Sequence, residues 1–250
     1  RDRYGFVNMI NKIVAEENPK YMMVAFDIGK TFRHEKYKDY KGGRRETPED
    51  LKVQFPIAKK ILTAMGIKYL ECEGYEADDI IGTISSWCDK DPEYEALIVS
   101  SDKDLLQLIS EETVVKLLKP KDYIMMDEAT FIQTYGFEPI KMIDLKALMG
   151  DASDNIPGVK GIGEKTAIKL LTQYGSLDGI YENIDNIKGS THEKLVTGNE
   201  DAYYSKELVT IYREVPLNIT WDDLLYGNEN TNELIQLYNC LLYTSPSPRD

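Results

Sequence analysis

The sequence predicts an α/β fold, in which a twisted and mostly parallel sheet is flanked by helices and followed by a helical region. Short apolar runs such as Ala96–Ser100 have the composition of buried parallel strands, and they alternate with longer runs that have helical spacing. After about residue 150 only helical patterns follow. We therefore expect an α/β core over residues 1–149 and a helical region over residues 150–240.

The elements of the core follow one another with turn signals between them. Helical spacing over residues 1–18 and 51–65 predicts two helices, the second kinked at Pro56. Strands are expected at Tyr21–Phe26, Ile67–Leu70, Ala96–Ser100, Thr113–Leu118 and Tyr123–Met126. Asp127 can cap the next helix, and Pro139 suits the first turn of the one after it.

Composition excludes several classes of protein. A chain of 250 residues with 42% hydrophobic residues can bury a sizeable core. No apolar run approaches the length of a membrane span, and no signal peptide is recognisable. Three scattered cysteines and two histidines argue against a disulfide framework, a zinc site and histidine-based metal sites, which fits a reducing cytoplasm.

The most informative stretch is Gly74–Asp79, where Glu76, Asp78 and Asp79 precede a run with helical spacing. These acids therefore fall in the first turn of a helix, and Glu76 and Asp79 share one face of it. Acids at a helix start also occur simply because they cap the helix and complement its dipole. Other acidic residues decide between a capping and a functional interpretation.

Further acidic residues recur in the same style. Asp27 ends one predicted strand, Asp102 and Asp104 follow another, and Asp151 and Asp154 lie three residues apart. Sites in open α/β sheets form beyond the carboxyl ends of the strands. Carboxylates that converge there repel one another unless cations neutralise them, and crowded carboxylate oxygens suit Mg²⁺ or Mn²⁺. The sequence thus predicts a site for divalent metal ions.

A basic segment stands out in a chain whose net charge is −13. Between Lys30 and Arg45 there are seven basic residues and two acidic ones, interleaved with Phe32, Tyr37 and Tyr40. Basic side chains attract phosphates, and aromatic rings stack on unpaired bases. A solvated loop is the alternative interpretation of the same pattern.

A second distinctive stretch is Asn155–Ala167, a tight, glycine-spaced connection between two predicted helices. Glycines at Gly158, Gly161 and Gly163 allow the backbone to approach a ligand closely. Free amides at the start of the following helix form an anion site, and Lys165 adds positive charge. We interpret the hairpin as a binder of phosphate backbone without base readout.

Taken together, these motifs resemble the flap endonuclease family, in the form found as the 5′-nuclease domain of bacterial DNA polymerase I. The resemblance runs from about Tyr4 to Leu225, through Phe26-Asp27 with Phe32–Glu35, Gly74–Asp79, Ser101–Leu105 and Gly150–Ala167. It implies a resolvase-like (PIN-like) nuclease fold with a helix–three-turn–helix DNA-binding element, which carries the helix-hairpin-helix-type motif.

The resemblance also implies roles for individual residues. The family's acidic metal-site positions match Asp27, Glu76, Asp78, Asp79, Asp102, Asp104, Asp151 and Asp154. Its basic clamp near the scissile phosphate matches Arg33, Tyr40, Lys41 and Arg44. Its duplex-holding hairpin matches Gly158, Gly161, Gly163 and Lys165, often with a monovalent cation such as K⁺.

The chain departs from the family pattern at its start. Members of the family begin with a strand that carries a further metal-binding Asp and lies in the middle of the sheet, whereas this sequence starts inside the following helix. We therefore expect a weakened fold and one ligand fewer. The segment Tyr243–Asp250 extends no element, so residues 241–250 are expected to be a disordered tail that is not native.

The expected activity is hydrolysis of phosphodiesters assisted by two Mg²⁺ ions, with Arg33 and Lys41 stabilising negative charge in the transition state. Expected substrates are DNA with 5′ flaps, nicks or RNA primers, processed in replication and repair by a monomer in the bacterial cytoplasm, attached to the polymerase region of its parent chain. The alternatives are a DNA-binding fragment without catalysis, a ribonuclease of the related small α/β class and a calcium-binding protein. The hairpin argues against the ribonuclease, and no loop has the spacing of a calcium hand.

Overall fold

The computed structural model describes residues 2–227 and 234–239, so the predicted tail at 241–250 lies outside the described residues. Its centre is a six-stranded sheet with the order β2-β1-β6-β3-β4-β5. The strands are β1 (Tyr21–Ala25), β2 (Lys68–Leu70), β3 (Glu95–Ser100), β4 (Thr113–Leu118), β5 (Tyr123–Met126) and β6 (Leu234–Asn239). Neighbouring strands are parallel except for the antiparallel pair β4–β5, which confirms the predicted fold class.

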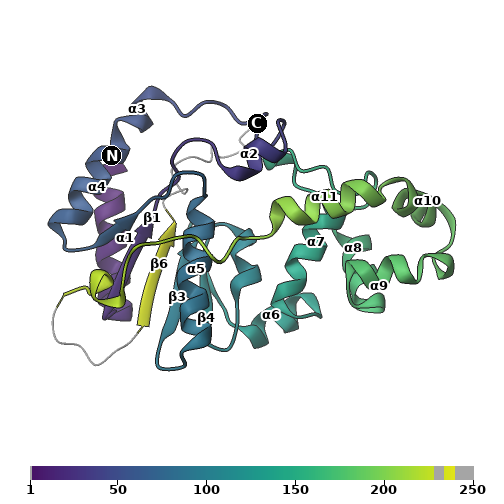
Figure 1. Cartoon of the computed structure of the whole chain (residues 1–250). Coiled ribbons are helices and arrows are strands. Elements are labelled where there is room, and N and C mark those ends of the chain that lie inside the picture. Colours follow the sequence, from purple (N-terminus) through teal and green to yellow (C-terminus); the bar gives the residue numbers. More distant parts are fainter. Residues whose placement is uncertain (1, 228–233, 240–250) are drawn as a thin grey trace.

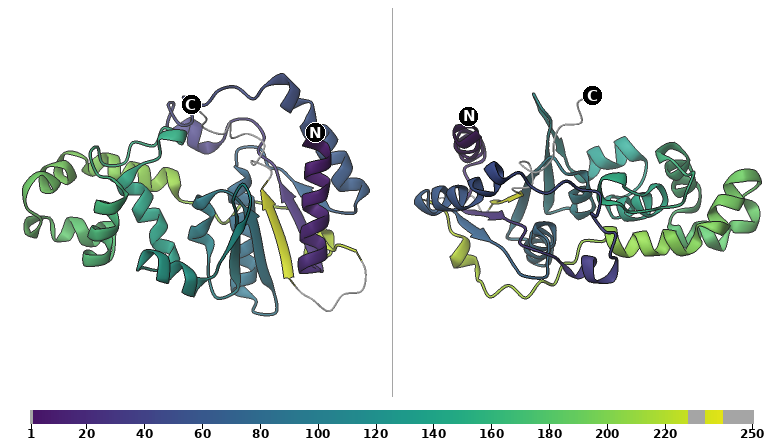
Figure 2. Two further views of the ribbon diagram at one scale, coloured as in Figure 1. Left: turned by 180° about the vertical axis from the view of Figure 1, so that it is seen from behind. Right: turned by 90° about the horizontal axis from the view of Figure 1, so that it is seen from above.

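Helices cover both faces of the sheet (Figures 1 and 2). The helices associated with the sheet are α1 (Asp2–Glu17), α2 (Phe32–Lys36), α3 (Glu49–Lys52), α4 (Gln54–Ala64) and α5 (Ala77–Lys90). Alternate residues of β1 serve two cores: Met22 packs with Ile10 of α1, and Met23 packs with Ile80 of α5. This period of two places α1 and α5 on opposite faces.

Residues 128–209 extend from one end of the sheet as a helical part, seen on the right of Figure 1. It consists of α6 (Glu128–Tyr135), α7 (Met142–Met149), α8 (Glu164–Tyr174), α9 (Leu177–Glu182), α10 (Gly189–Thr197) and α11 (Asn199–Val209). Short 3₁₀ turns complete the chain: η1 (Lys103–Leu108), η2 (Pro139–Lys141), η3 (Ala152–Asp154), η4 (Ile184–Asn186) and η5 (Trp221–Leu224). Every helix within the described ranges is too short or too polar to cross a membrane.

Two features differ from the sequence-based expectation. The helical pattern of residues 51–65 is not kinked at Pro56 but broken at Val53, between α3 and α4. Pro56 falls in the first turn of α4, where its missing N–H has no partner to lose.

The second difference concerns the middle of the sheet. No strand was predicted near the C-terminal end of the sequence, yet β6 lies there between β1 and β3. Its Gln236 pairs in register with Met22 of β1 and Leu97 of β3. Gln236 is fully buried, and neither of its side-chain polar atoms has a hydrogen-bond partner. The central position of the sheet is therefore filled, by a strand with a polar residue among apolar neighbours.

Candidate metal centre and nucleic-acid interface

The predicted acidic residues gather at the carboxyl ends of the strands, as the parallel topology requires. Asp27 follows β1, Asp102 follows β3, and Glu76 is the N-cap residue of α5. One pocket brings most of them together with basic residues. It is lined by Glu76, Asp78, Asp102, Asp104, Asp154, Arg33, Tyr40, Lys41 and Arg44, and by the apolar Ile156, Leu208, Val209 and Ile211.

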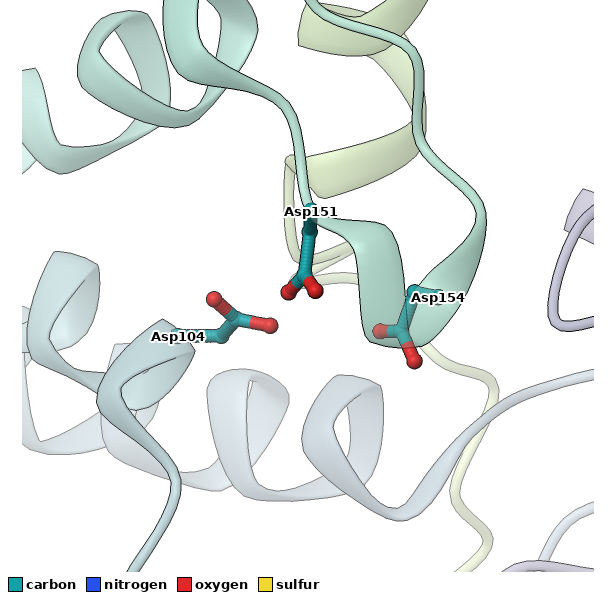
Figure 3. Close-up of side chains that lie close together, drawn as sticks. All are labelled: Asp104, Asp151 and Asp154. Carbon is teal, nitrogen blue, oxygen red and sulfur yellow. The ribbon is translucent and has the colours of Figure 1, made fainter. Parts of the chain in front are cut away.

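Three carboxylates in this region form a compact group (Figure 3). Asp104 in η1 faces Asp151 and Asp154 in the turn after α7, and one oxygen of each lies within 4.8 Å of the others. Asp104 Oδ1 is buried and accepts no hydrogen bond. A buried carboxylate oxygen without a donor, beside two further carboxylates, is the donor set that Mg²⁺ or Mn²⁺ prefers. The residues present therefore fit a divalent metal ion.

Lys146, which the sequence analysis did not single out, lies beside the carboxylates of Asp104 and Asp151. Lys146 Nζ, on α7, lies 3.5 Å from Asp104 Oδ1 and 3.2 Å from Asp151 Oδ2. The longer contact is an ion pair without hydrogen-bond geometry, which is why the Asp104 oxygen still lacks a donor. Lys146 was missed because helical periodicity marks core positions, and nothing in the pattern shows that this lysine turns back to Asp151.

Glu76 and Asp79, which we call the paired carboxylates, are neutralised by the chain itself. Arg33 Nη1 donates to Glu76 Oε2 at 2.6 Å and to Asp79 Oδ2 at 2.8 Å, and Arg33 Nη2 donates to Asp79 Oδ1 at 2.9 Å. Burial alone would raise the pKa of Glu76, but the charges of Lys41 and Arg33 outweigh it and lower that pKa. Glu76 is thus held ionised in a buried place.

Asp78, Asp102 and Asp104, which we call the crowded carboxylates, behave in the opposite way. Burial raises the pKa of Asp78 well above its usual value, and the neighbouring charges of Asp102 and Glu76 raise it further. Burial likewise raises the pKa of Asp102, and burial together with the Asp102 charge raises the pKa of Asp104 to about 7. Lys41 and Lys146 lower the pKa values of these groups, but burial and the neighbouring negative charges outweigh the two lysines.

Two other predicted metal ligands, Asp27 and Asp151, accept hydrogen bonds from backbone amides, and their pKa values shift in opposite directions. Asp27 Oδ1 accepts from the amide of Ala77 at 2.6 Å and so fixes the start of α5, while burial raises the pKa of Asp27. Asp151 accepts from Ser153 N at 2.9 Å. Burial would raise the pKa of Asp151, but hydrogen bonds from Ser153 and the charge of Lys146 lower it.

The basic clamp residues lie against these acids. Tyr40 Oη donates to Glu76 Oε1 at 3.0 Å, and Lys41 Nζ forms an ion pair with the same oxygen. Arg44 forms an ion pair with Asp154. The backbone amide of Lys41 donates to the carbonyl of Asp154 at 2.8 Å, so the clamp segment and the acidic turn after α7 are fastened to each other.

Arg33 is placed differently from the exposed basic residue that the sequence suggested. Its side chain is buried, and every guanidinium nitrogen donates. Besides the paired carboxylates, it donates to the carbonyls of Leu208 at 2.9 Å and Thr210 at 2.7 Å. A contact between Arg33 and DNA stays a prediction; in this arrangement Arg33 orients Glu76 and Asp79.

Gln107 binds the same stretch of backbone as Arg33, at and just after the end of α11, and no motif in the sequence pointed to this residue. Its side-chain amide donates to Val209 O at 2.9 Å and accepts from Ile211 N at 3.0 Å. Tyr212 N donates to Asp79 Oδ1 at 2.9 Å. We call residues 208–212 the exit segment of α11. Its successive backbone groups are held by the side chains of Arg33, Gln107 and Asp79.

The glycine hairpin lies on the surface of the helical part. Gly158 has φ of 59°, and a Cβ there would lie 2.3 Å from the amide nitrogen of Gly150. Its own amide donates to Ser205 Oγ of α11 at 2.9 Å. Gly161 has φ of 86°, and its carbonyl accepts from Lys194 at 3.3 Å.

Gly163 caps α8 without a side-chain bond, so amides of its first turn stay open to a ligand, and Lys165 beside them is exposed. The hairpin therefore offers backbone groups and the exposed charges of Lys160 and Lys165, with Glu164 between them. Binding of DNA by these residues stays a prediction.

Comparison with known proteins agrees with this arrangement. Residues 2–136 match the N-terminal resolvase-like domain of 5′-3′ exonucleases, and residues 137–232 match their C-terminal SAM fold. The chain is 45% identical to DNA polymerase I of Bacillus caldotenax over 246 residues, which is 97% of this chain and 28% of that protein. It is 46% identical to DNA polymerase I of a Streptococcus pneumoniae strain over 240 residues. That alignment covers 94% of this chain and 27% of that polymerase.

Solved structures share the fold. A zinc-bound T5 5′-exonuclease aligns with a TM-score of 0.69 and 24% identity, covering 84% of this chain and 81% of that one. The catalytic core of Rad2 in complex with DNA aligns with a TM-score of 0.60 and 18% identity, covering 90% and 73%. Since both matched domains occur here in order and account for most of the described residues, the chain belongs to the 5′-3′ exonuclease family and corresponds to the 5′-nuclease domain of bacterial DNA polymerase I.

Proposed function

We propose that this chain is a structure-specific 5′ nuclease that hydrolyses DNA phosphodiesters, and RNA primers on DNA, at 5′ ends and flaps. The observation that carries the proposal is the pocket in which crowded carboxylates, one of them with an oxygen that accepts no hydrogen bond, face Lys41 and Arg44. A site that holds divalent cations on one side and basic side chains on the other is suited to a phosphate group.

The metal ligands on this proposal are Asp104, Asp151 and Asp154, with Asp78 and Asp102 beside them. When bound, Mg²⁺ or Mn²⁺ supplies Lewis-acid charge next to the phosphate. Not every predicted acid needs to touch a metal: Asp27 fixes the start of α5, and Asp79 holds Arg33 and the amide of Tyr212.

The basic side chains have a separate task. Arg44 pairs with Asp154 in this structure, so a metal ion that neutralises Asp154 would free Arg44 for phosphate oxygens. Lys41 pairs with Glu76 and lines the same pocket, where it can turn toward a phosphate oxygen. Placed there, Lys41 stabilises the negative charge that gathers in the transition state. Tyr40, buried against Glu76, keeps that carboxylate oriented.

Substrate selection rests on shape. We propose that the hairpin of Gly158, Gly161, Gly163 and Lys165 holds the duplex backbone: Gly158 shapes the turn, while open amides after Gly163 and the charge of Lys165 make the contacts, with K⁺ at the hairpin carbonyls as a further proposal. The clamp segment then admits the single-stranded 5′ end. As partners we propose DNA and, since this chain spans 28% of the length of a polymerase that it matches, a polymerase region in the same protein. A monomer in the bacterial cytoplasm completes the proposal.

Cleavage of a 5′-labelled flap substrate tests the proposal, with Mg²⁺ and with EDTA, for the chain as given and for Asp78→Asn. We expect cleavage that depends on Mg²⁺, and loss of cleavage with retained flap binding in Asp78→Asn. Asp127→Asn is the matched control, because Asp127 caps α6 at the surface and Asn caps helices equally well. Flap binding without cleavage would favour the non-catalytic alternative, and loss of binding in Asp78→Asn would contradict the site assignment.

A further inference from the structure

Three aromatic rings from three separate segments meet beside the acidic pocket. Phe32 begins α2, Tyr75 immediately precedes Glu76, and Tyr212 ends the exit segment of α11. Tyr75 and Tyr212 are stacked, with ring centroids 5.5 Å apart and planes inclined by 18°. Phe32 lies 5.9 Å from Tyr75 and 6.2 Å from Tyr212. We call these three residues the ring cluster.

The ring cluster is not part of a hydrophobic core. Among the described residues, none of its members belongs to the three buried clusters, and Tyr212 is 39% exposed. The rings around Trp221 offer a contrast, because Tyr94 stacks on Trp221, Trp87 meets it edge-on, and all three pack against the main core. An exposed group of stacked rings that supports no core is available to a ligand.

The ring cluster is also fastened directly to the acidic motifs. Arg33, which holds the paired carboxylates, lies with its guanidinium carbon 4.4 Å from the centroid of the Phe32 ring. The amide of Phe32 donates to Gly74 O at 2.9 Å, and the amide of Tyr212 donates to Asp79 at 2.9 Å. The cluster thus keeps a fixed position relative to the carboxylates.

We propose that the ring cluster is a stacking platform for an unpaired nucleobase of the strand whose phosphate lies in the acidic pocket. The inference rests on the proposed function and adds to it a subsite that contacts bases rather than phosphates. Tyr75 stacks on the Tyr212 ring and Phe32 meets it edge-on, yet Tyr212 remains 39% exposed, and on this proposal the base lies against that exposed surface.

A nucleobase fits this place better than an apolar peptide side chain. Phe32 belongs to the segment Lys30–Arg45, whose exposed Lys30, Lys38 and Arg45 would attract the phosphates on either side of the base. Aromatic platforms interleaved with basic residues are the means by which proteins hold single strands without reading their sequence. Any base therefore satisfies the platform.

The test compares two flap substrates that differ only in bases. In EDTA, which prevents cleavage, fluorescence anisotropy measures the affinity for a duplex with a short thymidine 5′ flap and for the same duplex with an abasic flap. We expect the chain to bind the thymidine flap on the order of tenfold more tightly than the abasic flap. We expect Tyr212→Ala to lose this difference by weakening only the thymidine complex, and Tyr212→Phe to retain it.

Tyr123→Ala is the matched control, because Tyr123 is also 39% exposed but lies on β5, away from the ring cluster. Equal affinities of the unmodified chain for the two flaps would overturn the inference while leaving the proposed function in place. An equal loss for both flaps in Tyr212→Ala would also overturn it. Failure of the unmodified chain to bind either flap or the plain duplex would contradict the proposed function itself.

Discussion

The paired and the crowded carboxylates lie in and beside one pocket, yet they are stabilised in opposite ways. Glu76 and Asp79 receive hydrogen bonds from a buried arginine, and Lys41 adds a second positive charge at Glu76. Asp78, Asp102 and Asp104 are half-buried and share too little positive charge, so the pKa of each is raised by desolvation. The first group is complete without a ligand, and the second is complete only with a cation.

This difference separates structural acids from functional ones better than the acidic motif alone. Two residues apart in the sequence, Glu76 and Asp78 fall into different groups because one faces Arg33 and Lys41 and the other faces Asp102. A buried ion pair holds geometry, whereas a buried group of like charges binds an external counter-ion.

The largest expected effect comes from removing the internal counter-ion. Arg33→Met should lower the free energy of unfolding by about 3–5 kcal/mol, because it leaves Asp79 buried without its positive partner and Glu76 with Lys41 as its remaining positive partner. Denaturant unfolding measures this change. Lys52→Met, which breaks the exposed Lys52–Glu49 pair, should change stability by less than about 1 kcal/mol. Equal losses in the two variants would contradict the description of Glu76 and Asp79 as dependent on Arg33.

The second largest expected effect on stability comes from Mg²⁺, acting as the counter-ion of the crowded carboxylates. Mg²⁺ at about a hundredfold excess over its dissociation constant should stabilise the chain by about 2.7 kcal/mol. Asp104→Asn should stabilise the metal-free chain, since it removes one of the crowded charges, and should reduce the response to Mg²⁺. Thermal unfolding with and without Mg²⁺ measures both changes. A full Mg²⁺ response in Asp104→Asn would remove Asp104 from the set of ligands.

The third prediction extends the comparison to the glycine hairpin, which we propose binds DNA mainly through backbone groups rather than through charged side chains. Gly158→Ala places a Cβ against Gly150 at positive φ, so it should cost at least about 1–2 kcal/mol and weaken binding of plain duplex severalfold. Gly163→Ala is the matched control, because a Cβ there has nothing within 4 Å and φ is −94°. Fluorescence anisotropy with plain duplex compares the two variants. Equal duplex affinities would show that the Gly158 turn does not position the duplex.

The smallest expected change in stability concerns Gln236, a buried polar residue that we do not expect to bind a cation. Gln236 and Asp104 both have buried side-chain atoms without hydrogen-bond partners, but Gln236 lies beside Met22 and Leu97 in the sheet. Gln236→Leu should therefore stabilise the chain by about 1 kcal/mol, by the same amount with and without Mg²⁺. If the gain in thermal stability of Gln236→Leu depended on Mg²⁺, Gln236 would be connected with the metal centre, and the distinction between Gln236 and Asp104 would be wrong.

Much of the fold follows from local patterns. β4 and β5 have the predicted bounds because two short, mostly apolar runs and a turn at Pro120–Asp122 define them locally. The meeting of the acids was predictable too, because parallel strands deliver their ends to one edge. β6 was not, since its place between β1 and β3 depends on which segment fills the sheet rather than on its own pattern.

Side-chain partners were the least predictable part of the site. Arg33 belongs to a basic run that favours exposure, and its burial depends on carbonyls nearly two hundred residues away, at Leu208 and Thr210. Lys146 and Gln107 likewise act through contacts that cross between parts of the chain. Charge and periodicity describe one segment at a time, so they do not show which distant segments exchange hydrogen bonds.

The exit segment of α11 has a consequence for modularity. Its backbone between residues 208 and 212 is bound by Arg33, Asp79 and Gln107, so the last turn of the helical part supplies hydrogen-bond partners to the acidic motifs of the nuclease core. Residues 1–149 expressed alone would leave the Arg33 and Gln107 groups without these partners. A helical part exchanged between relatives would keep the acidic pocket intact only if the graft included residues 208–212.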